Sequence, residues 1–121
     1  MLKLFEAYKD IICSYHIEKY EVFGDNLRLR VHIMLIDNSI LYVRETIING
    51  ERKSYSYHWQ DKEKKLLFRW DNAPDWDVET FPHHKHVRDV NNKIEPSYER
   101  TLDKVLAIIR RHILKEEKEI M

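Results

Sequence analysis

The two ends of the chain carry helical patterns of apolar residues. Between residues 2 and 12 the apolar side chains recur near helical spacing, with charged residues between them. A second stripe follows Thr101, which is a suitable N-cap residue. Its members are spaced three and four apart and are Leu102, Val105, Leu106, Ile109 and Ile113. The pattern predicts one amphipathic helix at each end.

The middle of the chain alternates between apolar and polar residues, which is typical of half-buried strands. Short turns rich in Gly, Asn and Asp separate the alternating segments. The predicted strands are 14–23, 27–35, 40–48, 53–60 and 66–71. This order predicts an α+β fold, in which helices from both termini cover one apolar face of an antiparallel meander of about five strands.

The loop between the second and third predicted strands sets how they pair. A three-residue loop at 37–39 places Leu35 opposite Leu41 and His32 opposite Arg44. A loop one residue shorter would exchange the two faces of one strand. Apolar matching therefore favours the three-residue loop.

Residues 72–97 contain all three prolines and show no long alternation. We interpret them as one long loop, which its Trp, Phe and His content indicates to be ordered. Loops of this length in small domains usually have a function.

At 121 residues, the chain is predicted to be a single domain, residues 1–121. Its formal net charge is zero, so any nucleic-acid site must come from a local patch. No apolar run is long enough for a membrane span, and the single Cys13 fits a reducing, cytoplasmic environment. The polar face of the predicted sheet gathers basic residues, although any half-buried sheet needs a polar side. These residues are Arg28, Arg30, His32, Arg44, His58 and Arg69.

The stretch from Tyr55 to His86 holds all three Trp and four of the seven His, so it is the candidate working surface. Cleavage of RNA without a metal needs two proton-transferring groups and positive charge at the phosphate. The predicted catalytic residues are three imidazoles and an aspartate that orients one of them: His83, His84, His86 and Asp71. The predicted RNA contacts are Arg69, Lys85, Arg88, Trp76, His58, Arg44 and Arg30. Trp59 and Trp70 lie on the apolar parity of their strands, which favours a role in the core.

Other roles for the histidines remain open. They could ligate a metal, but only His84 and His86 share a side of an extended chain, and no partner Cys or His-Glu-x-x-His motif is present. We therefore predict no metal site and no cofactor. A loop held in place by histidine hydrogen bonds, without catalysis, is the plainer alternative.

Several motifs of this chain resemble the TumE family of small prokaryotic toxins from toxin–antitoxin pairs. They are Tyr57-His-Trp-Gln-Asp61, Arg69-Trp-Asp-Asn-Ala-Pro74, Phe81-Pro-His-His-Lys-His86, Glu95-Pro-Ser97 and the closing Thr101-Leu-x-x-Val-Leu106. Family members often carry two histidines after Asp-Asn-Ala-Pro, where this chain has Asp75-Trp76. That difference moves the acid–base prediction to the later histidines.

The resemblance implies a cytosolic toxin whose partner is a small antitoxin encoded nearby. RNA cleavage is our extrapolation from the residues and is not implied by the family. The alternative is a non-catalytic module that binds protein or RNA through the basic sheet face. A homodimer is a further partner that the sequence allows.

Overall fold

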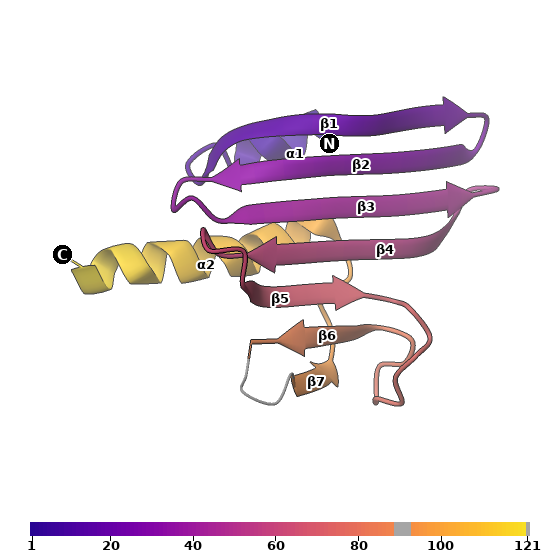
Figure 1. Cartoon of the computed structure of the whole chain (residues 1–121). Helices are drawn as coiled ribbons and strands as arrows, with labels where there is room; N and C mark the ends of the chain where they lie inside the picture. Colours follow the sequence, from indigo (N-terminus) through magenta and orange to yellow (C-terminus); the bar gives the residue numbers. More distant parts are fainter. Residues whose placement is uncertain (89–92, 121) are drawn as a thin grey trace.

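The computed structural model describes residues 1–88 and 93–120. Within these residues, seven strands form one antiparallel sheet in chain order, β1 to β7 (Figure 1). The elements are α1 (Leu2–Ala7), β1 (Ile12–Phe23), β2 (Asn26–Leu35), β3 (Ile40–Ile48), β4 (Glu51–Gln60), β5 (Leu66–Asp71), β6 (His84–Val87), β7 (Lys93–Pro96) and α2 (Leu102–Ile120). The α+β class and the meander order are as predicted.

The prediction of about five strands was wrong, because β6 and β7 lie inside the segment interpreted as a long loop. Each has only four residues, too few to show alternation in the sequence. β6 pairs with β5, and β7 forms the sheet edge, where Pro96 is tolerated. Residues 89–92 of the predicted loop lie outside the described residues.

The N-terminal helix was also predicted too long, since α1 ends at Ala7 rather than near residue 12. The backbone then turns at Tyr8, whose carbonyl accepts hydrogen bonds from Ile11 and Ile12. Ile11 is fully buried and Ile12 opens β1 opposite Leu35. Ile11 is thus a turn residue before the sheet and Ile12 a sheet residue, and neither belongs to a helical stripe.

The predicted pairing of β2 with β3 was wrong by two residues, although the faces were assigned correctly. The loop is Ile36–Asn38, because the Leu35 N–H donates to the Ser39 carbonyl at 2.9 Å. Leu41 consequently lies opposite Ile33. The third residue of such a loop takes a left-handed conformation, which Asn tolerates better than Ser. Asn38 has φ 68°, so the loop begins one residue earlier than expected.

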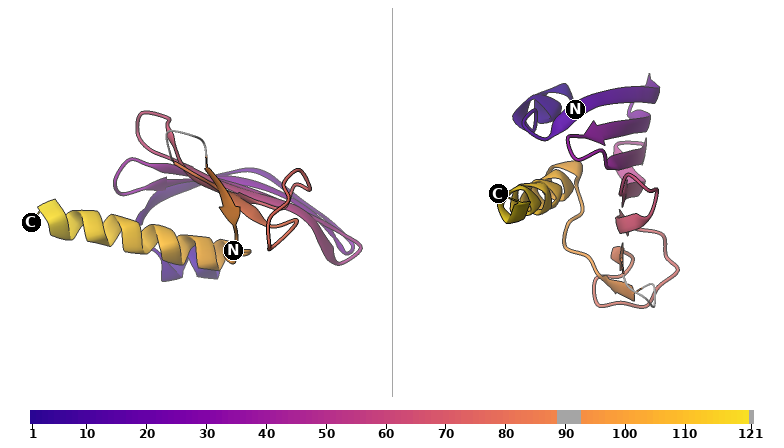
Figure 2. Two further views of the ribbon diagram at one scale, coloured as in Figure 1. Left: turned by 90° about the horizontal axis from the view of Figure 1, so that it is seen from below. Right: turned by 60° about the vertical axis from the view of Figure 1, so that its left-hand side comes forward.

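Both helices lie on the same side of the sheet (Figure 2). The core between them is built from the predicted stripe of α2, from Phe5 of α1 and from one face of β2 to β5. Trp59 and Trp70 are buried there, as their parity predicted. Neither described helix is long and apolar enough to cross a membrane.

The opposite, uncovered side of the sheet is called the open face below. Residues on it are adjacent in the strand pairing and alternate with the buried residues of the core. All six predicted basic positions lie on it: Arg28, Arg30, His32, Arg44, His58 and Arg69.

We expect Leu106→Ala to lower the free energy of unfolding by about 2–5 kcal/mol, because it leaves a cavity between α2 and the sheet. Leu106 is fully buried, whereas Arg111 of the same helix is exposed. Urea denaturation of both alanine variants measures the difference. Equal stability of Leu106→Ala and Arg111→Ala would contradict the packing of α2 on the sheet.

Candidate functional site

A line of polar and aromatic side chains crosses the open face from strand to strand. Neighbouring members are cross-strand partners, one from each of β1 to β6. The members of this cross-strand row are His16, His32, Tyr42, His58, Arg69 and His86. The ring centroids of the first four follow one another at 5.2, 6.1 and 6.2 Å. The row therefore ends at one of the predicted catalytic histidines.

Beside this end of the row lie three of the predicted catalytic residues. Asp71, the last residue of β5, is the cross-strand partner of His84, and His86 lies two residues further along β6. His84 Nε2 is 3.0 Å from Asp71 Oδ1, and His86 Nε2 is 3.8 Å from Asp71 Oδ2. Metal-ligating atoms of the three residues all lie within 4.8 Å of one another. We call this group the Asp–His–His cluster.

The carboxylate of Asp71 is buried, so it needs hydrogen-bond donors to offset the loss of water. Arg69 Nε donates to Oδ2 at 3.1 Å, and the Ala73 N–H donates to Oδ1 at 3.0 Å. The intervening Asn72 accepts from the Tyr55 N–H and so joins the end of β5 to β4. The Asp-Asn-Ala-Pro motif is thus a turn that fixes the carboxylate in place.

His84 is held from both sides and is only 1% exposed. Its Nδ1 lies 3.0 Å from the Pro82 carbonyl, which can only accept a hydrogen bond. Nδ1 therefore carries a proton, and in the neutral ring the lone pair is on Nε2, which lies beside Asp71. Despite the 3.0 Å separation, Nε2 makes no hydrogen bond to any described residue.

Trp76, in the loop between β5 and β6, lies over the cluster. Its ring centroid is 6.4 Å from that of His84 and 5.9 Å from that of His86. Trp76 itself is exposed, as predicted. The His86 side chain keeps 24% of its surface, so it is the histidine of the cluster that solvent reaches.

Three predicted site residues do not join the cluster. The Tyr55 hydroxyl lies 2.7 Å from His83 Nδ1, on the helix-covered side, and the two rings stack. Lys85 Nζ is 3.9 Å from a Glu99 carboxylate oxygen, and Arg88 pairs with Asp61 at 3.1 Å. His83 and Lys85 differ from His84 by one residue and so point to the other face.

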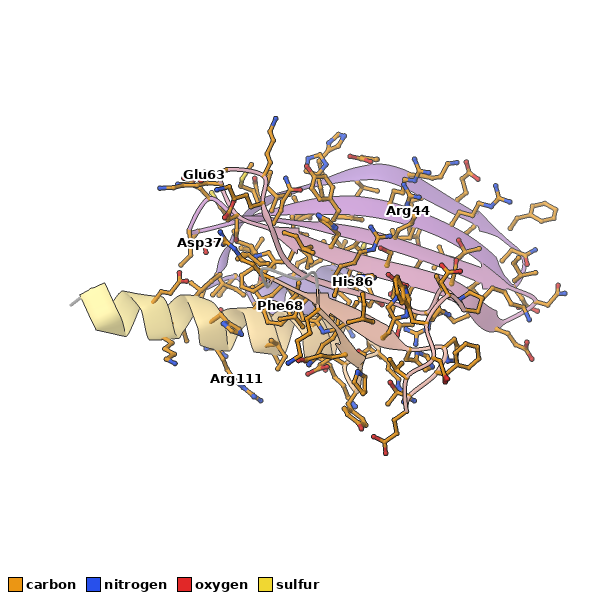
Figure 3. All side chains as sticks on the ribbon, turned by 60° about the horizontal axis from the view of Figure 1, so that its bottom comes forward. Asp37, Arg44, Glu63, Phe68, His86 and Arg111 are labelled. Atoms are coloured by element: carbon orange, nitrogen blue, oxygen red, sulfur yellow. The ribbon has the colours of Figure 1, made fainter. Side chains whose placement is uncertain are left out.

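Two pockets open beside the row. One pocket has a volume of about 320 Å³ and is lined by Tyr42, His58 and Arg69 of the row, among other residues. The other, of about 360 Å³, includes Asp71, and both pockets are lined by Arg44 and Arg69. Figure 3 shows Arg44 and His86 projecting from the sheet, whereas Arg111 extends from α2. Arg69, a member of the row, and Arg44 therefore line both pockets.

Burial lowers the pKa of both solvent-accessible histidines near Arg69. For His58 the second cause is the Arg69 guanidinium, which also disfavours the charged ring. For His86 the Asp71 carboxylate opposes the effect of burial and raises the pKa, but the net direction is still down. Both environments therefore favour the neutral form of the imidazole over the charged form.

Sequence reasoning missed Tyr42 and His16 as members of the row. Tyr42 is 41% exposed on the open face. The alternation of β3 already gives it the parity of Arg44, but the predicted register placed Arg44 opposite His32. Only the correct register aligns Tyr42 with the histidines on either side.

We expect Arg69→Gln to raise the pKa of His58, because it removes the cation that disfavours imidazolium. Histidine ring signals followed by NMR through a pH titration measure the shift. Arg28→Gln, on the same face but outside the row, is the matched control and should leave His58 unchanged. An unaltered His58 titration in Arg69→Gln would contradict the closeness of the two side chains.

Comparison with known proteins gives one match. The family model described as toxin TumE matches residues 1–113, which include the whole row and the Asp–His–His cluster. No curated protein and no solved structure matches the chain.

Proposed function

The chain belongs to the TumE toxin family, and we propose that it is a toxin that cleaves RNA between the cross-strand row and the Asp–His–His cluster. One observation carries the proposal: Arg69 lies between His58 and His86 in the strand pairing. Arg69 can bind a phosphate and has an imidazole on either side. Metal-independent RNA cleavage needs these groups: one cation and two proton-transferring side chains.

The guanidinium groups of Arg69 and Arg44 suit a phosphodiester, because arginine binds phosphate oxygens through two parallel hydrogen bonds. Two strand spacings separate the backbones of His58 and His86 by about 10 Å, so their rings reach opposite sides of a phosphate at Arg69. One imidazole removes the proton of the ribose 2′-hydroxyl, and the 2′-oxygen attacks phosphorus. The bond from phosphorus to the 5′-oxygen breaks, and the other imidazole, in its protonated form, donates to that leaving oxygen. The products are a 2′,3′-cyclic phosphate and a 5′-hydroxyl.

The buried members of the cluster support these steps without touching the substrate. His84 is buried beneath Trp76, so in this proposal it does not exchange protons with RNA. Asp71 in turn orients Arg69. His83, Lys85 and Arg88 make their contacts elsewhere, and the proposal gives them no part in the chemistry.

The proposed substrate is single-stranded RNA, which is found in the cytoplasm. Tyr42 and Trp76 are both exposed, at opposite sides of Arg69, and offer faces on which unpaired bases stack. Arg30 and Arg28 continue the positive charge along the open face away from the site. RNA binding should accordingly weaken as salt rises.

We expect His86→Ala to lower the rate of RNA cleavage by about 10²–10⁴-fold, because it removes one proton-transfer group. His58→Ala should have an effect of the same order, and His83→Ala and His32→Ala should have little. The measurement is single-turnover cleavage of a defined oligonucleotide, with analysis of the product ends and with folding checked by circular dichroism. Wild-type rates in both His86→Ala and His58→Ala would contradict the proposal.

The open basic face also favours a second candidate function, a non-catalytic module that binds RNA. In that case the wild-type protein would bind oligonucleotides in a salt-dependent way and return them intact. Substitution of Arg30 or Arg44 would then weaken binding far more than His86→Ala.

Family membership implies an antitoxin partner, and the proposal assigns its docking to the edge strand β1. Among the described residues, one side of β1 has no neighbouring strand, so its backbone groups can pair with an added strand (Figure 1). The strand also exposes apolar side chains, which a soluble partner would cover. They are Tyr15, Ile17, Tyr20, Val22 and Phe23.

We expect the double variant Tyr20→Ser with Phe23→Ser to lose at least tenfold in affinity for the antitoxin encoded beside the toxin, while RNA cleavage is retained. Calorimetric titration with the purified antitoxin measures the loss. Lys19→Ala, on the same strand, is the control. The alternative is that a second copy of the chain binds to β1. A wild-type dimer that becomes a monomer in the double variant, with antitoxin affinity unchanged, would contradict the assignment.

A further inference from the structure

We infer that Asp71, His84 and His86 form a binding site for one divalent transition-metal ion. The three residues come from the end of β5 and the start of β6, and they lie on the same face. Their ligand atoms converge within 4.8 Å. Metal binding at this site does not depend on the proposed ribonuclease activity, but its regulatory consequence does.

The His84 ring is oriented so that its unpartnered Nε2 lies next to Asp71. Because Nδ1 donates to the Pro82 carbonyl, the neutral ring has its lone pair on Nε2, and this atom lies 3.0 Å from Asp71 Oδ1. Two electron-rich atoms at 3.0 Å repel each other unless a proton or a metal ion lies between them. Nε2 is buried and has no hydrogen-bond partner among the described residues, so a metal ion would satisfy it.

The distances between the histidine nitrogens and the Asp71 oxygens also suit a metal ion. Two ligands at about 2.0–2.1 Å from a tetrahedral zinc ion are separated by about 3.3 Å. The two histidine nitrogens lie 3.0 and 3.8 Å from the carboxylate oxygens of Asp71, on either side of that value. Because His86 is only partly buried, rotation of its side chain can close the remaining gap.

Hydrogen bonds from neighbouring groups hold the proposed ligands in place. Metal-bound histidines usually donate their other ring N–H to a backbone carbonyl or carboxylate, which fixes the ring. The Pro82 carbonyl has this role for His84, and Arg69 and the Ala73 N–H hold the Asp71 carboxylate. The ligands are therefore oriented before any ion arrives.

Two imidazoles and one carboxylate select zinc, cobalt or nickel over magnesium or calcium, which prefer oxygen ligands. Three protein ligands also leave a fourth position for water. Bound metal would occupy the Nε2 lone pair of His86, which the proposed proton transfer requires. The metal-loaded toxin is then inactive, and a chelator restores it.

The binding test uses the full chain without a histidine tag. Zn²⁺ is titrated by calorimetry, and Co²⁺ is added separately, because its visible absorption bands report tetrahedral coordination. We expect one Zn²⁺ per chain and at least a tenfold loss of affinity in His86→Ala and His84→Ala. His86 is partly exposed, so its variant keeps the test valid if His84→Ala fails to fold.

His32→Ala is the matched control, because His32 lies on the same face beside another histidine and Glu18. Retained binding in this variant with loss in His86→Ala supports the site. Absence of stoichiometric binding, or equal affinity in the wild type and the folded His86→Ala variant, overturns it.

RNA cleavage with chelator and with Zn²⁺ separates the two proposals. Activity in chelator that falls when Zn²⁺ is added supports both. Zn²⁺ binding without cleavage under either condition leaves the metal site intact and refutes the ribonuclease. Cleavage that needs Zn²⁺ supports the site but overturns inhibition and the metal-free mechanism. Cleavage unchanged by bound Zn²⁺ overturns inhibition alone.

Discussion

The pairing of β5 with β6 brings a buried carboxylate against a buried imidazole, and the candidate site depends on this contact. Removing a carboxylate from water costs several kcal/mol unless donors replace the lost hydrogen bonds. Asp71 has donors from Arg69 and Ala73, but His84 presents a lone pair to it in the neutral ring. The pair is therefore complete only when a proton or a metal ion lies between its two members.

This requirement links the two proposals about the site. A proton on Nε2 turns His84 into a cation that pairs with Asp71, and the neighbouring His86 stays available for chemistry. In the second proposal, a metal ion in the same space would also bind His86. Under the two proposals together, the metal-free site is active and the metal-loaded site is inactive.

The sheet gives a chain of zero net charge one basic surface. Alternation places apolar residues against the helices and Arg28, Arg30, Arg44 and Arg69 on the open face. Antiparallel pairing then aligns His58, Arg69 and His86 across three strands. The edge strand β1, where we propose that the antitoxin docks, is the strand furthest from these residues in the sheet order.

The sequence alone predicted a helix at each end of the chain and the buried faces of β2 to β5, and it singled out Asp71, His84 and His86 as candidates. Helical and strand periodicity are local properties, so they can be read from neighbouring residues. Tertiary structure decided the rest. Asn38 in a left-handed conformation moved the β2–β3 register by two residues, β6 forms because it pairs with β5, and β7 forms because it pairs with β6. Which histidines meet Asp71 depends on this long-range pairing: it joins His84 and His86 to the carboxylate and leaves His83 beside Tyr55.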